Sequence, residues 1–490
     1  MEFSTPEKMG IKSENVHNFV KALEDAHLAT HDILIMRGGK LIYEAYWKPF
    51  DKDFNHRMYS VTKSFVAIAI GFLEQEGKLS LDDKMSKYFA EELKNQPDMN
   101  MHNQTVRHML MMSTSKLERY WFEAKPDDRV KFYFENDKKE SRPSGTIFQY
   151  DSTGSFVLGA LVERITGMTL IDYLRSRLFD KIGVSKDAYC LKCPGGYSWG
   201  DSALLCTPRD LMLVAQFMMN GGKWNGEQIL NEKFVRDATS ALIMNNHLND
   251  VEFDSQGYGY LIWRTLDNSF FFNGMGCQFA ICVPDKDIIM VYNADNQGKP
   301  YAKKTIFDNF FNFIARAASD EEVAVDEDAV KKLEEYTEKL ELLHTYGDKT
   351  SPIVDKINNK TYILNENNMG ISKIKFSFEN DGGTLYYTNE QGSKELAFKM
   401  NANAFTKFPQ DGYADEIGTV PGNRRFDCAV SASWANEKHL GIKVQIIDTY
   451  FGVLDMHFGF DEDRVGIRML KTAEDFLDEY VGYAEGRIID

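Results

Sequence analysis

One apolar segment constrains the fold of this chain more than any other part of its sequence. Between Val61 and Leu73 nearly every position is apolar and none is proline, which predicts a helix that is buried on all sides. Ser60 stands at its start, where serine is a favoured cap and unpaired backbone N–H groups point outward. Lys63 follows three residues later, so its side chain rises on the same face of the helix, one turn away.

Ser60 and Lys63 have the chemistry of a nucleophile and its base. Burial disfavours the charged form of a lysine, and a neutral amine within reach of a serine hydroxyl is a general base. The Ser-x-x-Lys pattern by itself is weak, because it occurs at two further places, Ser113/Lys116 and Ser372/Lys375. The former follows an apolar run and is predicted to mark a helix end. The latter lies in an alternating strand, which places residues three apart on opposite faces.

The composition argues against several classes of function. The chain has 490 residues, enough for two or three domains, and a net charge of −17 that disfavours nucleic acid or an anionic membrane as partner. Residues 1–15 are polar, unlike a signal peptide, and no apolar run reaches the roughly 20 residues that span a bilayer. The Cys-x-x-Cys at 190–193 lacks the partners of a zinc site. We expect a soluble cytoplasmic protein with reduced thiols and without metal or cofactor.

The first part of the chain has strand patterns at both ends and helical patterns between them. Strand-like segments at 33–47 and 258–292 flank a mostly helical stretch from 60 to about 241, and a helix at 303–317 closes the unit. This order predicts one α/β domain over residues 1–318, with a sheet assembled from its two ends and a helical lobe beside it.

The remainder of the chain has a different pattern. Residues 319–344 contain an acidic run and a short helical pattern, which predict a linker. Residues 345–490 contain short alternating strands separated by turns, which predict a closed or sandwiched β domain. We find no catalytic constellation in this second domain.

Two further stretches bear on function. Tyr150 and Ser152 precede an apolar helix, so the phenol could pass protons while the hydroxyl at 152 binds Lys63; the alternative is a buried tyrosine with a satisfied hydroxyl. The run from Asn273 through Gly274 and Met275 lies between two strands, where glycine lets backbone N–H groups approach an oxyanion. The alternative for that run is a plain hairpin turn.

These three stretches, in this order and rough spacing, resemble the serine β-lactamase-like hydrolases. That superfamily includes class C β-lactamases, DD-peptidases, related esterases and 6-aminohexanoate oligomer hydrolases. The resemblance covers about residues 5–318, and beyond 330 the chain is only vaguely similar to C-terminal β-barrel appendages of bacterial relatives. Supporting family-like sequence stands outside the three motifs, at 76–83, 105–110, 146–150, 207–211 and 220–226. The resemblance implies a β-lactamase-like antiparallel sheet flanked by helices.

The resemblance also implies roles for individual residues. Ser60 is similar to the acylated nucleophile, Lys63 to its base, and Tyr150 to the residue that protonates the leaving group and helps activate water. The oxyanion hole would be the backbone N–H groups of Ser60 and Met275, with Cys277 as the alternative to Met275. The remaining substrate-binding positions implied by the resemblance are Ser152, Asn273 and Gly274.

Two departures from the family pattern indicate which branch the chain resembles. Ser152 stands where class C β-lactamases have asparagine, and the third motif, Phe272-Asn273-Gly274, lacks the lysine or histidine that penicillin-recognising members have before the glycine. Without that cation, which binds the substrate carboxylate, the run is closer to the esterase and 6-aminohexanoate-hydrolase branch. We therefore expect a serine hydrolase that cleaves an ester or amide bond of a small substrate. Aromatic residues near the third motif either line an apolar pocket or pack the sheet: Trp199, Tyr258, Tyr260, Trp263, Phe271 and Phe272.

Several alternatives remain open. One is a β-lactamase or D-amino-acid peptidase, and another, of a different class, is a catalytically inactive ligand-binding or scaffold protein. A rival nucleophile is Ser198 in Gly196–Gly200, which fits the G-x-S-x-G elbow but lacks the strand before it and the helix after it that this motif needs. The sequence also leaves a homo-oligomer open.

Overall fold

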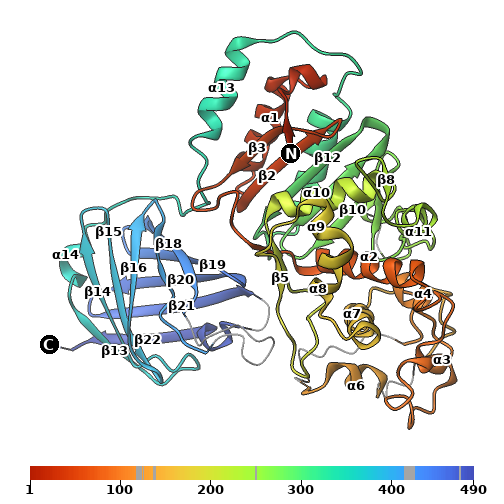
Figure 1. Ribbon diagram of the computed structural model, residues 1–490. Coiled ribbons are helices and arrows are strands. Elements are labelled where there is room, and N and C mark those ends of the chain that lie inside the picture. The colour runs from red at the N-terminus through yellow and green to blue at the C-terminus, as the bar shows by residue number, and fades with distance from the viewer. Residues whose placement is uncertain are drawn as a thin grey trace. The chain divides into compact units, whose positions relative to one another are not determined.

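The computed structural model describes residues 1–116, 124, 126–135, 140–248, 251–412, 425–473 and 476–489. The chain divides into two compact units, Met1–Glu341 and Leu342–Asp490 (Figure 1). Each unit is built around its own sheet, and the two sheets differ in topology.

The first unit contains a seven-stranded sheet assembled from its two ends. Its strand order is β1-β3-β2-β12-β11-β10-β9, and β12 pairs antiparallel with β2, so that Val291 lies opposite Leu34. The sheet strands are β1 (Glu2–Phe3), β2 (Thr30–Arg37), β3 (Lys40–Tyr46), β9 (Trp263–Thr265), β10 (Ser269–Gly274), β11 (Gln278–Val283) and β12 (Ile288–Ala294). This arrangement confirms the predicted β-lactamase-like fold class.

Helices cover both faces of this sheet. On one face, Ile33 and Ile35 of β2 share an apolar core with α1 (Ser13–Asp25), α12 (Ala302–Asn309) and the π-helical turn η7 (Phe310–Ala315). On the other face lies α10 (Pro208–Met219), where the Sγ atom of Cys282 is 3.8 Å from the carbonyl oxygen of Ala215. The alternation of side chains along each strand thus gives each face of the sheet its own apolar layer.

The segment predicted as a linker begins within the first unit. Helix α13 (Glu327–Thr337) packs on α1, with the Tyr336 ring edge-on to the His17 ring at 4.9 Å between centroids. The division between the two units falls after Glu341. Figure 1 shows α13 beside α1, at the end of a long loop.

Helix α2 (Thr62–Gln75) runs through the middle of the helical lobe. All residues from Thr62 to Leu73 are buried, and α2 packs against α7 (Ser152–Thr166), α8 (Leu170–Leu174) and α11 (Glu232–Ala238). The other elements of this unit are η1 (Glu7–Met9), β4 (His56–Arg57), η2 (Tyr59–Val61), η3 (Met85–Lys87), α3 (Met99–His102), α4 (Val106–Leu110), α6 (Arg129–Phe134), η4 (Arg175–Phe179), α9 (Asp180–Ile182), β5 (Tyr189–Cys190), β6 (Leu204–Cys206), β7 (Lys223–Trp224), β8 (Glu227–Gln228), η5 (Glu252–Asp254) and η6 (Pro284–Lys286).

The second unit is a closed barrel, as the alternating pattern predicts. Nine strands form the ring, which a parallel pairing between β16 and β18 closes at Lys399 and Ser431. Its elements are α14 (Val354–Ile357), β13 (Thr361–Leu364), β14 (Lys373–Glu379), β15 (Gly382–Asn389), β16 (Gly392–Met400), β17 (Ala404–Lys407), β18 (Asp427–Asn436), β19 (His439–Ile447), β20 (Phe451–Asp461), β21 (Arg464–Ala473), η8 (Asp478–Tyr480) and β22 (Gly482–Ile488). Closure pairs the sheet edges, which would otherwise expose unpaired backbone groups.

In the described part of the chain, no single helix is both long enough and apolar enough to cross a bilayer. One bent pair of helices, Ser152–Thr166 with Leu170–Ile182, has the length and composition of a span when the two are taken together.

Candidate active site

The chain reaches Ser60 through a short strand and a left-handed turn. Strand β4 pairs with β6, and the Met58 N–H donates to the carbonyl oxygen of Leu204 at 2.9 Å. Tyr59 then adopts a φ of 44°, which is rare for a bulky residue and persists only where the surroundings enforce it. Ser60 follows in the turn η2 and lies directly before α2.

The structure brings Ser60 and Lys63 into contact. Lys63 Nζ donates to Ser60 Oγ at 2.8 Å and to the backbone carbonyl oxygen of Asp201 at 2.6 Å. The Lys63 side chain is 2% exposed, so the two contacts hold the amine in an interior position. The predicted capping role of Ser60 is wrong, because its side chain caps no helix and its hydroxyl faces the lysine instead.

Tyr150 lies beside this pair. Lys63 Nζ is 5.3 Å from the centroid of the Tyr150 ring, and that ring stacks on Trp263 with 5.8 Å between centroids. The next residue, Asp151, caps α7 by accepting from the Gly154 N–H at 2.8 Å, which fixes the backbone at this point. Among the described residues, the Tyr150 hydroxyl forms no hydrogen bond with the Ser60–Lys63 pair.

Ser152, the first residue of α7, does not meet Lys63 in the way the sequence suggests. Within the described ranges, no hydrogen bond joins the Ser152 hydroxyl to the lysine, and the Asp201 carbonyl accepts from Nζ instead. Sequence reasoning missed Asp201, since no local motif marks the loop before β6.

The end of β10 approaches the segment that leads to Ser60. A Cβ atom on Gly274 would lie 2.5 Å from the backbone oxygen of Met58, closer than real side chains come. Only glycine therefore permits this approach, which brings Asn273, Gly274 and Met275 to the side of the η2 turn. The Met275 side chain is 37% exposed, whereas Gly274 is buried.

Gln278 holds the turn that follows β10. Its amide nitrogen Nε2 donates to the carbonyl oxygens of Met275 at 2.7 Å and Ala294 at 2.8 Å, and its Oε1 accepts from the Ala294 N–H at 3.0 Å. The side chain is fully buried, so these bonds replace its lost hydration. Gln278 is thus a structural support of the Met275 backbone that sequence reasoning missed.

The aromatic residues near this turn mostly pack the interior. Tyr258, Tyr260, Phe271 and Phe272 are each at most 1% exposed, as is Trp199. Trp263 is half-buried and, of this set, is the residue that stacks on Tyr150. Of these aromatic residues, therefore, only Trp263 remains a candidate for the wall of an apolar pocket.

Ser198 occupies a loop rather than a nucleophile elbow. It pairs across a bridge with Lys192, and its N–H donates to Glu163 Oε1 at 3.2 Å. The strand β5 ends at Cys190 and the helix α10 begins only at Pro208, so the strand–turn–helix context of the elbow is missing.

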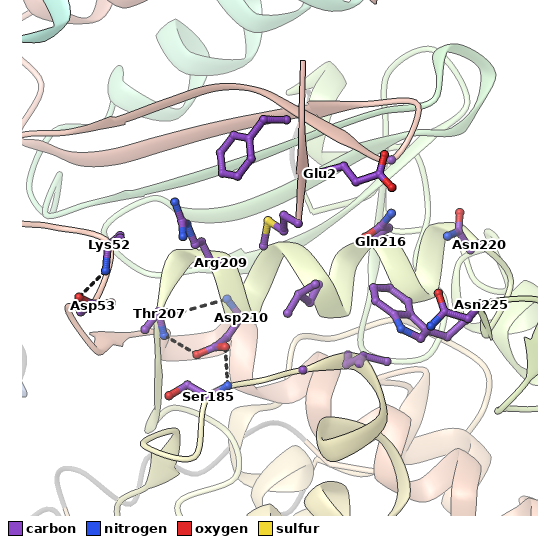
Figure 2. A pocket seen from close by; sticks show the side chains of 17 residues that line it. Glu2, Lys52, Asp53, Ser185, Thr207, Arg209, Asp210, Gln216, Asn220 and Asn225 are labelled. Atoms are coloured by element: carbon purple, nitrogen blue, oxygen red, sulfur yellow. Dashed lines mark hydrogen bonds and ion pairs between the residues drawn. The ribbon is translucent and has the colours of Figure 1, made fainter. Parts of the chain in front are cut away.

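A separate cavity of about 780 Å³ lies between β1 and α10. In Figure 2 the Asp210 carboxylate accepts from the backbone N–H groups of Ser185 at 2.7 Å and Thr207 at 3.0 Å, and Lys52 pairs with Asp53. Arg209 is paired with Glu44. Among the described residues that line this cavity, none belongs to the Ser60 site.

The described residues contain no group of three or more His, Cys, Asp or Glu side chains arranged to hold a metal ion. The candidate site consists instead of a hydroxyl, an amine and a phenol, with backbone N–H groups nearby. Such a set can attack a carbonyl carbon, move one proton and stabilise an oxyanion.

Comparison with known proteins assigns the family. Residues 16–308, more than half of the chain, match the model of the family Beta-lactamase, and the chain belongs to this hydrolase family. It is similar to the 6-aminohexanoate-dimer hydrolase of Paenarthrobacter ureafaciens, with 26% identity over 220 residues, 42% of this chain and 56% of that protein. It is also similar to penicillin-binding protein 4* of Bacillus subtilis (strain 168), with 23% identity over 193 residues, 36% of this chain and 41% of that protein.

The chain thus spans about half the length of these curated relatives. Among solved structures, the chain is similar to the octameric penicillin-binding protein homologue from Pyrococcus abyssi, with a TM-score of 0.51 and 16% identity. The match covers 96% of this chain and 99% of that protein's chain. At that identity the likeness shows a shared fold.

Proposed function

We propose that this protein is a serine hydrolase that cleaves an ester or amide bond of a small substrate through an acyl-Ser60 intermediate. The observation that carries the proposal is the 2.8 Å contact between Ser60 Oγ and Lys63 Nζ, at the start of the buried helix α2. A hydroxyl within hydrogen-bond reach of an amine is the arrangement that nucleophilic catalysis requires. Membership of the Beta-lactamase family supports the same chemistry.

In the proposed mechanism, Ser60 Oγ attacks the substrate carbonyl carbon while its proton passes to Lys63 Nζ. Tyr150, whose ring lies 5.3 Å from that amine, supplies a proton to the leaving group and later helps activate water. The backbone N–H groups of Ser60 and Met275 would hold the oxyanion, and Gln278 supports the Met275 backbone. Hydrolysis of the ester at Ser60 then regenerates the hydroxyl.

The substrate is proposed to be neutral and apolar at its acyl group. The run Phe272-Asn273-Gly274 lacks the cation that binds a carboxylate in penicillin-recognising members, and Trp263 offers an aromatic surface beside Tyr150. The likeness to a 6-aminohexanoate-dimer hydrolase agrees with an amide or ester substrate. The likeness to penicillin-binding protein 4* favours a second candidate, a β-lactamase or D-amino-acid peptidase.

Covalent labelling tests the nucleophile. A fluorophosphonate probe with intact-mass analysis should add one group to the wild-type chain and none to Ser60→Ala. Ser113→Ala and Ser198→Ala are matched controls that should label like the wild type. If Ser198→Ala lost labelling while Ser60→Ala kept it, Ser198 in the G-x-S-x-G motif would be the nucleophile. No labelling at all would favour an inactive ligand-binding or scaffold protein.

A substrate panel separates the two candidate activities. We expect faster turnover of short-chain p-nitrophenyl esters or small amides than of penicillins or nitrocefin, with Ser60→Ala as the blank. A kcat/KM for nitrocefin about tenfold above every ester, a difference of about 1.4 kcal/mol, would favour the β-lactamase instead.

We propose that the barrel contributes to substrate gating or to assembly rather than to the chemistry. A truncated chain ending at Glu341, the limit of the first compact unit, should still label with the probe if its melting curve shows that it folds. A folded but unlabelled truncation would assign part of the site to the barrel. Sedimentation of both chains would test a homo-oligomer.

A further inference from the structure

The loop before β6 places a buried carboxyl next to the Ser60–Lys63 pair. The backbone oxygen of Asp201 accepts from Lys63 Nζ at 2.6 Å, and the Asp201 side chain is 1% exposed. Within the described residues, its Oδ1 atom is buried and has no hydrogen-bond partner. A carboxyl removed from water in this way is costly unless nearby charge offsets the loss of hydration.

Two buried arginines provide that charge. Arg57 and Arg129 are 0% and 1% exposed, and their guanidinium carbons lie 4.6 Å and 4.8 Å from the ring centroid of Trp199. Arg57 Nε donates to the backbone oxygen of Ser202 at 3.2 Å, next to Asp201 in the chain. The two guanidinium groups and the Lys63 amine are therefore all buried in the same part of the first unit.

The charges around Asp201 act on it in opposite directions. Burial raises the pKa of the Asp201 carboxyl, while the positive charges of Lys63, Arg129 and Arg57 oppose that rise. The neighbouring thiols carry no charge, because burial raises the pKa of Cys190 and Cys193. The groups that interact electrostatically with Asp201 are Lys63, Arg57 on β4, Arg129 on α6, Cys190 and Cys193. Glu163 on α7 acts on Cys190, and the Tyr150 ring lies 5.3 Å from Lys63 Nζ.

We propose that Asp201 is a positioning residue for the reaction of Ser60: its carbonyl fixes the Lys63 amine, and its carboxylate sets the proton affinity of that amine against Arg57 and Arg129. The inference rests on the proposed function and adds to it a residue that controls the basicity of Lys63. Family resemblance did not point to this side chain.

The consequence for the reaction follows from charge balance. As the bond forms between Ser60 Oγ and the acyl carbon, the Oγ–H bond breaks and its proton becomes the third proton of the Lys63 ammonium. A buried carboxylate stabilises that ammonium, whereas the two guanidinium groups destabilise it. Without the carboxylate, Lys63 would be deprotonated at lower pH, but it would also be a weaker base.

The test is the pH profile of Ser60 labelling in the full chain. The second-order rate constant for the fluorophosphonate probe is measured from about pH 5 to about pH 10 for the wild type and for Asp201→Asn. We expect the acid limb of the variant to move to lower pH by about one unit, and its plateau rate to fall about tenfold. Asp32→Asn changes another buried carboxyl group, one that accepts from Asn293, and should leave the profile unmoved.

A reciprocal variant makes the test independent of the folding of Asp201→Asn. Arg129→Gln removes a positive charge, so it should move the acid limb to higher pH, and the double variant should return it toward the wild-type position. A wild-type profile in Asp201→Asn, or an Arg129→Gln limb that moves to lower pH, overturns the inference. A wild-type chain that never labels at Ser60 overturns the proposed function itself, and the inference with it.

Discussion

Two Ser-x-x-Lys sequences in the first unit have opposite structures. Ser60 and Lys63 touch at 2.8 Å, whereas Ser113 Oγ donates to the His108 carbonyl at 3.1 Å and Lys116 reaches the Asp98 carboxylate at 3.5 Å. Burial does not separate them, because the two lysine side chains are 2% and 7% exposed. The difference lies in the backbone.

The backbone after Ser60 is helical, and the backbone after Ser113 is not. A helical turn places residues three apart on one face, so Lys63 rises beside the hydroxyl. Lys116 instead forms an isolated bridge with Ser141, in extended chain, and its amine turns to Asp98. The same four-residue pattern therefore yields a reactive contact in one place and a structural ion pair in the other.

The largest expected effect comes from substituting the lysine in each of the two Ser-x-x-Lys sequences. Lys63→Ala should lose about as much probe labelling as Ser60→Ala, roughly 10³-fold or more, because members of one catalytic unit are not additive. Lys116→Ala should change the labelling rate less than about twofold, since its amine meets a carboxylate rather than a hydroxyl. A loss below about tenfold in Lys63→Ala would assign that lysine to structure.

A second effect concerns the anchor of the Ser60 segment. His56 begins β4, and its Nε2 accepts from His31 Nδ1 at 2.8 Å, since its own Nδ1 donates to the Arg57 carbonyl at 3.0 Å. The bond between the two rings needs a neutral His56, whose Nε2 is the acceptor. Burial lowers the pKa of His56 from 6.5 to about 3 and that of His31 well below its ordinary value.

The sign of the pH dependence follows. Because the folded pKa is lowered, the stability from each ring is present above the unfolded value near 6.5 and is lost as the pH falls below it. We expect His56→Phe to flatten the dependence of the unfolding free energy by about 2 kcal/mol between about pH 7 and pH 5 in urea titrations. His27→Asn, at an exposed position, is the matched control for the loss of a histidine.

The smallest effect concerns the ion pair of Lys116. Burial raises the pKa of the Asp98 carboxyl, but hydrogen bonds from Ser141 and the Asn100 N–H and the charge of Lys116 bring the net pKa below its ordinary value. Its contribution is therefore present above the unfolded pKa near 3.8 and lost as the pH falls through the folded value.

Lys116→Met should accordingly lower the unfolding free energy by about 1 kcal/mol near pH 7, and by less near pH 3.5. Lys131→Met, in an exposed pair with Glu135, is the matched control and should cost at most about 0.5 kcal/mol. An equal loss in Lys116→Met at both pH values would mean that the stem of the side chain, rather than its charge, supports this region.

Much of the fold could be predicted because its signals are periodic and local. The apolar run after Ser60 predicts the buried helix, the strand patterns at both ends of 1–318 predict a shared sheet, and the alternation after 345 predicts the barrel. The predicted linker differs, since its helix α13 packs on α1 and adds Leu333 and Tyr336 to the core of the first unit. A helical pattern by itself does not say which surface will receive the helix.

The sequence by itself determined which serine and lysine share a helical turn, because three-residue spacing in an apolar helix is enough to fix that geometry. Only the tertiary structure decided which other groups contact this serine and lysine. Asp201, 138 residues from Lys63, gives its carbonyl to the amine, and Gly274 lies against the backbone of Met58. Such contacts join segments far apart in the chain, where no local pattern records them, and they arise only when both segments are packed around the same buried helix.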